Sequence, residues 1–444
     1  MKLFQQMLVA GASLSLLAPT VAQASDAVNL DEMNGYLRSD SKSTKFDNKT
    51  FINQVSEDLA ELKGRVDGLE AQQNNLEAGA FSSTTTMDGK AIMWIGGVDG
   101  GDEIGDHEAV ETGYSYTLNL NTSFTGDDNL YVRLKTGDVG GTSDPASKTD
   151  TSIWDNKATY HIETKDNDDK LKVDKMWYTG TIGDNITYFV GPRIENYYMY
   201  ITPSIYQPGA LKSMKLGGNS NFGASTDVGY GFKYENESGF GFASNIVSKD
   251  ADGSNGHLGK NDESKWDTQI AYTTDRWHVS ATLSNQQGWN GQAYNATSLA
   301  DSIADADGED ATGYALRAYW KPESTGTATP EISVGYDQRS SDTAVASGVA
   351  KESDSYFVGL TWRDMFQADD RIGFAVTQPL KVTGCNGTCN SSNTDVDPFV
   401  WEAYYAFRPN DSMEVRPAVF GGTDVYADTN DDIFGAVVTT TFKF

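Results

Sequence analysis

The chain has 444 residues and a formal net charge of −29, because Asp and Glu (63) far outnumber Lys and Arg (34). This acidity argues against nucleic acid as a partner, since the phosphate backbone repels a negatively charged surface. Two cysteines are too few for a disulfide scaffold, and 44 glycines against 11 prolines favour a β-rich fold with many turns.

The amino-terminal residues have the three parts of a Sec signal peptide. Lys2 supplies the positive charge, an apolar stretch runs from Met7 to Leu17, and Ala22-Gln23-Ala24 offers a small-residue cleavage site. The apolar stretch is too short to span a bilayer as a helix. We therefore expect residues 1–24 to direct export. Residues 25–50 are polar and unpatterned, and we expect them to form a linker.

A heptad pattern follows the linker and predicts a coiled-coil helix over residues 51–79. Apolar residues alternate there at spacings of three and four. The two seam positions hold Ile52, Leu59, Val66 and Gln73, and Val55, Leu62, Leu69 and Leu76. The alternative is one amphipathic helix packed on a domain, because fewer than four heptads are marginal for an isolated coiled coil. Residues 80–86 then lead into β-type sequence.

From residue 87 to 444 the chain reads as about sixteen strands in which apolar and polar side chains alternate with period two. The last strand, Ile433–Phe444, ends on an aromatic residue, as outer-membrane barrels often do. One face of the strands is apolar, and the other is too polar for the core of a soluble sandwich. The pattern predicts an all-β fold, a transmembrane antiparallel β-barrel over 87–444. Its last strand must pair with the first, near Met87–Val98, because hydrocarbon tolerates no open strand edge.

The expected connections alternate between short and long, which is typical of outer-membrane barrels with short periplasmic turns. If so, four tryptophans lie at the short-turn end of their strands, where an interfacial aromatic girdle belongs. These are Trp177, Trp277, Trp320 and Trp362. An even strand number near sixteen leaves a water-filled lumen rather than a packed interior.

The longest expected connection, Gly191–Ser225, is aromatic-rich and fairly apolar for an exposed loop. We expect it to fold into the barrel and narrow the pore. The alternative is a loop that caps the outside or packs at a subunit interface. The candidate constriction residues are Arg193, Glu195, Tyr197, Tyr198, Lys212 and Lys215.

Basic residues also project from the polar faces of the strands, where charge is inexpensive only beside water. The candidate pore-wall residues are Arg133, Lys135, Arg317 and Arg416. These wall residues support a water-filled channel. The basic groups of the constriction, Arg193, Lys212 and Lys215, predict a weak anion preference despite the acidic chain.

Other chemistry has little support in the sequence. We expect Cys385 and Cys389 to form a small loop disulfide in an oxidising compartment, because no His or further Cys lies nearby to complete a zinc site. Asp305–Asp310 resembles the start of a calcium loop but lacks the later Glu. No nucleophile motif is evident, so we expect neither enzyme activity, nor a cofactor, nor a dedicated metal site.

Several stretches carry a resemblance to a known family. They are MKLFQQMLVA at the start, AELKGRVDGLEA (60–71) followed by FSSTTTMDGKA, IGGVDG (95–100), VGPRIENYYMYITPSIY (190–206) and KLGGNSNFGAS. In these the chain resembles cyanobacterial outer-membrane porins, often called iron uptake porins, which are related to carbohydrate-selective porins of the OprB type. The resemblance implies a trimeric barrel, a trimeric periplasmic coiled coil, and passive passage of small solutes and inorganic ions.

One family feature is missing. Members of this family usually carry an S-layer-homology domain that binds the cell wall, and residues 25–50 are too short to contain one. Cell-wall tethering is therefore doubtful. No iron-ligand cluster is visible either, so we interpret iron uptake as a consequence of general ion permeation.

The sequence thus predicts an outer-membrane diffusion porin for inorganic ions and small hydrophilic solutes. We expect it to be a homotrimer in contact with outer-membrane lipid and lipopolysaccharide, exported through a Sec signal peptide. Two alternatives remain: a sugar-selective porin, which aromatic rows along the lumen would favour, and a surface adhesin or receptor anchored by its barrel.

Overall fold

The computed structural model divides the chain into two units, Met1–Ser83 and Thr84–Phe444. It describes residues 63–65, 84–100, 110–139, 161–163, 165–167, 169–201, 204–218, 228–249, 256–258, 262–288, 310–341, 350–389, 397–424 and 432–444. In the first unit the described residues, 63–65, are helical. The rest of the coiled coil predicted over 51–79, the signal peptide and the linker lie outside the described residues and stay predictions.

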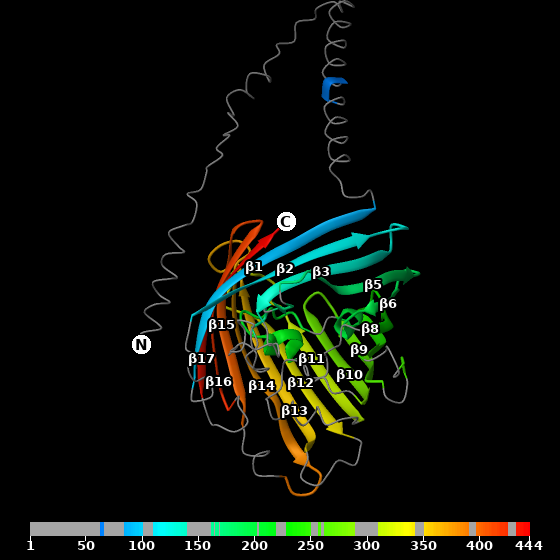
Figure 1. The fold of residues 1–444 in the computed structure, drawn as a ribbon, viewed down its shortest axis with the longest axis vertical. Helices are drawn as coiled ribbons and strands as arrows, with labels where there is room; N and C mark the ends of the chain where they lie inside the picture. Colours follow the sequence, from blue (N-terminus) through cyan, green and yellow to red (C-terminus); the bar gives the residue numbers. More distant parts are fainter. Residues whose placement is uncertain are drawn as a thin grey trace, which may run out of the picture. The chain divides into compact units, whose positions relative to one another are not determined.

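The second unit consists mainly of long strands (Figure 1). Those before the longest connection are β1 (Thr85–Gly100), β2 (Glu111–Thr122), β3 (Asn129–Val139), β4 (Lys165–Asp166), β5 (Lys172–Ile182) and β6 (Ile186–Arg193). Two 3-10 helices follow, η2 (Asn196–Met199) and η3 (Lys212–Gly217). The remaining strands are β7 (Val228–Glu235), β8 (Phe240–Ser248), β9 (Ser264–Thr273), β10 (Trp277–Gln287), β11 (Ala311–Trp320), β12 (Glu331–Ser341), β13 (Ala350–Arg363), β14 (Arg371–Cys385), β15 (Phe399–Asn410), β16 (Met413–Thr423) and β17 (Ile433–Lys443).

The strands form one closed antiparallel barrel. All but the two-residue β4 follow one another around it, which gives the sixteen strands that the sequence predicts. β17 pairs with β1, with Trp94 opposite Thr439 and Lys90 opposite Lys443. Gly89 and Phe444 also exchange backbone hydrogen bonds of 2.9 and 3.1 Å. The carboxy-terminal strand therefore closes the barrel and leaves no open edge.

The period-two pattern separates the two faces of the wall. Along β10, Trp277 and Val279 point outward and are more than half exposed, while His278 and Ser280 point inward. Large apolar side chains cover the outer faces of neighbouring strands in the same way. Such an outer face matches lipid, and the inner face matches water or polar packing.

Short and long connections alternate around the barrel as predicted, with one exception. The connection between β12 and β13, residues 342–349, is shorter than the turn at 321–330. The reason is that these two strands extend further than the polar sequence around them indicated. No helix among the described residues is long and apolar enough to cross a membrane.

The aromatic girdle is confirmed only in part. Trp277 lies opposite Trp320 at the short-turn end of β10 and β11, with ring centroids 6.2 Å apart. Trp362 lies near the same end of its strand and donates a hydrogen bond to the carbonyl of Ala328. The assignment of Trp177 to the girdle is wrong, because this side chain faces the interior and is only 6% exposed.

The interior of the barrel also differs from the expectation of a uniformly polar inner face. Inward side chains of β1 and β13–β17 form an apolar cluster with the long connection that follows β6. Its wall members include Trp94, Phe357, Val400 and Phe420. The inner wall is apolar there because a folded segment, and not water, covers it.

Candidate functional site

The connection after β6, which follows the fifth barrel strand, folds into the barrel. We call its described residues, 194–201 and 204–218, the lumenal segment; Figure 1 shows it in green within the ring of strands. Tyr206, Ala210, Leu211 and Met214 are at most 5% exposed and belong to the same apolar cluster as the inner wall. The apolar character of the sequence here reflects burial against the wall.

A buried carboxylate on β15 holds the centre of this segment. Glu402 accepts four hydrogen bonds: from the Tyr206 hydroxyl (2.8 Å) and from the backbone N–H groups of Gly209, Ala210 and Leu211 (2.7, 2.9 and 2.8 Å). The side chain is fully buried. Hydrogen bonds to an ionised carboxylate are stronger than neutral ones, so Glu402 is a main attachment point.

A buried guanidinium on β11 holds the end of the segment. Arg317 donates hydrogen bonds to the carbonyls of Leu216 (2.8 Å) and Gly218, and it forms an ion pair of 2.7 Å with Asp337 on β12. Leu216 has a positive φ of 59°, a conformation that costs a non-glycine residue about 1–2 kcal/mol. The fork of donors on Arg317 stabilises this turn.

The beginning of the segment is attached to β9. Asn196 and Tyr200 both donate hydrogen bonds to the carboxylate of Asp267, at 2.9 and 2.5 Å. The amide N–H of Ile201 donates to the side chain of Gln269 at 2.9 Å. The lumenal segment is therefore attached to three parts of the wall, which hold it in place inside the barrel.

Aromatic rings and lysines meet beside η2. Tyr131, Trp177, Tyr198 and Tyr197 form a ladder whose successive ring centroids are 4.3, 4.6 and 4.5 Å apart. At its end the hydroxyl of Tyr197 accepts hydrogen bonds from Lys175 (3.0 Å) and Lys215 (3.3 Å). Both ammonium groups also lie over the Tyr197 ring, 5.0 and 4.5 Å from its centre.

Carboxylates pair with part of the basic groups on this side of the lumen. Asp174 accepts hydrogen bonds from Arg133 and Lys165, and Glu195 pairs with Lys175. In the connection between β3 and β5, Glu163 lies 3.5 Å from Lys90 and 3.3 Å from Arg416. Burial raises the pKa of Glu163, but Lys90, Arg416 and Lys135 outweigh it and bring the pKa to about 2. Glu163 is therefore charged at neutral pH.

Basic groups nevertheless outnumber the carboxylates. We call this set the basic strip: Lys90, Arg133, Lys135, Lys165, Lys175, Lys212, Lys215 and Arg416. It runs from β16 past β1 and β3 to β5, and the lumenal segment supplies two of its members. The carboxylates that pair with it, Glu163, Asp174, Glu195 and Glu414, leave it net positive.

The two lysines of η3 differ in their environment. Burial and the neighbouring Arg133 lower the pKa of Lys215 to about 8, so it is largely protonated at neutral pH. Burial, Lys135 and Lys215 hold the pKa of Lys212 well below its usual range. Lys215 therefore contributes more positive charge to the lumen than Lys212 does.

The predicted site residues are brought together only in part. Glu195, Tyr197, Tyr198, Lys212 and Lys215 all lie in the lumenal segment. Arg193 faces the interior from the end of β6, where its Nε lies 3.4 Å from the Asp174 carbonyl.

The wall residues divide into two groups. Arg133, Lys135 and Arg416 belong to the basic strip, and Arg317 is 2% exposed beneath the lumenal segment. Arg317 faces inward as predicted, but it holds backbone carbonyls and does not border open water.

Sequence reasoning missed two central residues, Lys175 and Glu402. Lys175 and its neighbour Asp174 both pair with groups on the lumen side, because a register shift between β3 and β5 interrupts the alternation here. The strand period alone therefore did not indicate Lys175. Glu402 was visible on the polar face of β15, but its four donors come from a segment almost two hundred residues away. No local pattern indicates such a contact.

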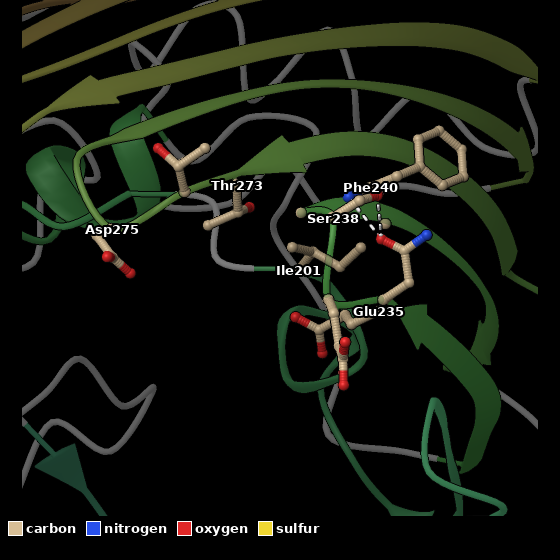
Figure 2. A pocket seen from close by; sticks show the side chains of 11 residues that line it. Ile201, Glu235, Ser238, Phe240, Thr273 and Asp275 are labelled. Atoms are coloured by element: carbon tan, nitrogen blue, oxygen red, sulfur yellow. Dashed lines mark hydrogen bonds between the residues drawn. The ribbon is translucent and has the colours of Figure 1, made fainter.

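A separate cavity of about 480 Å³ lies at the short-turn rim (Figure 2). The turns β7–β8 and β9–β10 line it with Glu235, Ser238, Thr273 and Asp275, and Ile201 of the lumenal segment closes one side. Ile201 fits there because Gly241 has no Cβ; one would lie 2.3 Å from the Ile201 side chain. The cavity thus marks where the segment passes the rim, apart from the basic strip.

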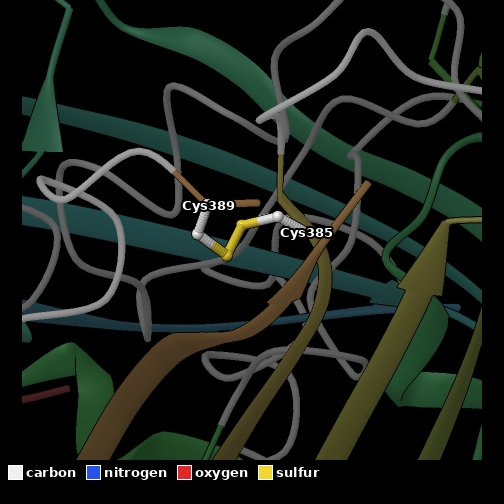
Figure 3. The surroundings of a disulfide bond; sticks show 2 residues. All are labelled: Cys385 and Cys389. Carbon is white, nitrogen blue, oxygen red and sulfur yellow. A yellow bond between two sulfur atoms is a disulfide. The ribbon is translucent and has the colours of Figure 1, made fainter. Parts of the chain in front are cut away.

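Cys385 and Cys389 form the predicted disulfide at the end of β14, with Cα atoms 5.2 Å apart (Figure 3). Most of the Asp305–Asp310 stretch lies outside the described residues. Among the residues that the structure describes, no three His, Cys, Asp or Glu side chains are grouped so as to hold a metal ion.

Comparisons with known proteins agree with this geometry. Residues 48–444 match the family model "Carbohydrate-selective porin, OprB family". An uncharacterized protein of Nostoc sp. is 26% identical over 423 residues, which cover 88% of this chain and 71% of that protein. An uncharacterized protein of Synechocystis sp. is 22% identical over 421 residues, covering 86% of this chain and 73% of that protein.

Solved porin structures share the fold. Pseudomonas putida OprB superposes with a TM-score of 0.52 at 13% identity, covering 85% of this chain and 97% of that one. The anion-selective porin from Comamonas acidovorans gives 0.52 at 10% identity, covering 82% and 100%. At these identities the likeness concerns the arrangement of strands alone.

Proposed function

We propose that the chain, which belongs to the carbohydrate-selective porin, OprB family, forms a water-filled channel for inorganic ions and small hydrophilic solutes. We propose further, from the charges in its lumen, that this channel prefers anions. The barrel is that of an outer-membrane channel and not of an enzyme. The specific part of the proposal is the selectivity: the channel passes anions in preference to cations, and ions in preference to sugars.

One observation carries it: the lumenal segment is fixed inside the barrel and adds Lys212 and Lys215 to the basic strip. The hydrogen bonds to Glu402, Arg317 and Asp267 hold these lysines beside the wall cations. A permeating ion that passes the segment therefore meets an excess of fixed positive charge.

Distance decides which charges act on such an ion. The chain is strongly acidic overall, but at physiological salt the Debye length is ~8 Å, so charges around a wide mouth are largely screened at the axis. Charges in a constriction act over shorter distances through less water. The basic strip therefore outweighs the acidic surface, and a weak anion preference follows.

The test is the reversal potential of single channels across a potassium chloride gradient. We expect an anion-selective potential for the wild type and a shift toward cations for Lys212→Glu/Lys215→Glu. Lys233→Glu is a matched control, because Lys233 also lies on the inner face but pairs with Glu235 on its own strand at 3.0 Å. A potential that the double variant leaves unchanged would mean that the segment does not border the ion path.

A second candidate is a sugar-selective porin, and the aromatic ladder from Tyr131 to Tyr197 favours it. Aromatic rings are good partners for the apolar faces of sugars. In this ladder, however, the rings face one another and Trp177 is almost fully buried. Titrating glucose and maltose into the recording chamber discriminates between the two: saturable block of the potassium chloride current supports the sugar channel.

Assembly and export complete the proposal. We propose a homotrimer, exported through the signal peptide of residues 1–24, with a coiled coil over 51–79. The outer faces of the strands expose many large apolar side chains, which suits contact with lipid and with neighbouring barrels.

A further inference from the structure

Two ammonium groups converge on one neutral oxygen in the lumen. Lys175 reaches the Tyr197 hydroxyl from β5 and Lys215 reaches it from η3, at 3.0 and 3.3 Å. Donors that share one acceptor atom are close enough to share one small tetrahedral anion. A phenol oxygen is a weaker acceptor than an anionic oxygen, so these donors are not matched to their present partner.

The nearby carboxylates do not fully neutralise the positive charge around the Tyr197 hydroxyl. Glu195 pairs with Lys175, and Asp174 pairs with Arg133 and Lys165. Among the described residues, no carboxylate lies within ion-pair distance of Lys215 or of Lys135. Like charges held close together and partly buried repel one another, and a bound anion relieves that repulsion.

The point is also open to an ion in the lumen. Lys135, Tyr197 and Lys215 are partly exposed and offer the access, whereas Lys175 is fully buried. Glu402 and Arg317 hold η3 in place on either side. The donors are therefore ordered before a ligand arrives, which lowers the entropic cost of binding.

From this geometry we infer that Lys175, Lys215 and the Tyr197 hydroxyl, with Lys135 nearby, form a binding site for small multivalent oxyanions of the phosphate and sulfate class. The inference rests on the proposed function, because it assigns a substrate class to the same constriction. It adds that such anions are bound at one point and not only attracted by the general field.

Binding in a conducting pore shows as saturable block. We would record single channels in dilute potassium chloride and titrate inorganic phosphate, and separately sulfate, into one chamber. We expect the chloride current to fall to a plateau with rising phosphate or sulfate. A current that only grows as phosphate is added, with no plateau, would overturn the inference.

The variants distinguish a site from a diffuse field. Lys215→Met removes one charged donor and should raise the half-blocking phosphate concentration about tenfold. Lys175→Met should raise it further, because Glu195 then keeps an uncompensated charge beside the anion. Lys215→Arg should retain block, and Lys233→Met should leave it unchanged.

Equal shifts in Lys215→Met and Lys233→Met would contradict a local site. Heat-modifiable electrophoretic mobility confirms that each variant is folded. The two proposals fail separately: a cation-selective reversal potential in potassium chloride alone refutes the anion channel, whereas anion selectivity without phosphate block refutes only the site.

Discussion

Replacing Glu402 by Gln should loosen the lumenal segment while leaving the barrel intact. In the wild type, one carboxylate oxygen accepts from Tyr206 and Gly209 and the other from Ala210 and Leu211. An amide nitrogen accepts no hydrogen bond, so Gln in either orientation leaves two of the four donors unpaired. At about 1.5–3 kcal/mol for each hydrogen bond to a charged group, the attachment weakens by roughly 3–6 kcal/mol.

The remaining contacts limit the effect to the middle of the segment. Arg317, Asp267 and Gln269 still hold its two ends. We therefore expect single-channel recordings of Glu402→Gln to show more open-channel noise, higher mean conductance and a weaker anion preference.

Glu331→Gln is the matched control for this experiment. Glu331 is also an inward carboxylate, but it pairs with Arg363 at 2.9 Å near the short-turn end of the wall. Its variant should conduct like the wild type. If Glu402→Gln also has wild-type noise, conductance and reversal potential, Glu402 does not position the constriction and the reasoning is refuted.

Two further predictions concern pH and assembly. The pKa of Lys215 is lowered to about 8, so its charge is present below that pH and is lost above it. The charged groups around Lys215 are Lys90, Arg133, Glu163, Asp174 and Lys175. Anion preference should fall as the pH rises through about 8, and Lys215→Met should reduce the size of this step in a pH series of reversal potentials. The trimer should survive deletion of residues 25–79, because fewer than four heptads with Gln73 in the seam contribute less than the barrel walls; a monomer by native mass measurement would make the coiled coil the organising element instead.

The barrel was predictable because its physics is local. Each strand must hide one face from water, so a period-two pattern such as that of Trp277–Leu283 shows which residues point outward. Because hydrocarbon tolerates no unpaired strand edge, β17 must pair with β1, and the structure shows this pairing. The unusual composition of residues 191–225 likewise indicated burial, and the lumenal segment is buried against the wall.

The detailed site was less predictable because it depends on contacts between distant parts of the chain. A tryptophan on a barrel strand is typical of an aromatic girdle. The side chain of Trp177, however, faces the interior and is covered by the lumenal segment. Arg317 was recognised as inward, yet only the three-dimensional fold shows that Leu216 and Gly218 occupy its donors. The strand period gives the direction of a side chain, and the fold decides its partner.

The most direct test of the account places a thiol on the lumenal segment. The chain has two cysteines, which are joined to each other, so Lys215→Cys carries the only free thiol. Single channels would be recorded while a negatively charged thiol reagent, or a positively charged one, is added. We predict a stepwise loss of anion preference with the negative reagent and its recovery toward the wild type with the positive one. Currents and reversal potentials that neither reagent changes would show that Lys215 does not face the ion path, contradicting the central claim.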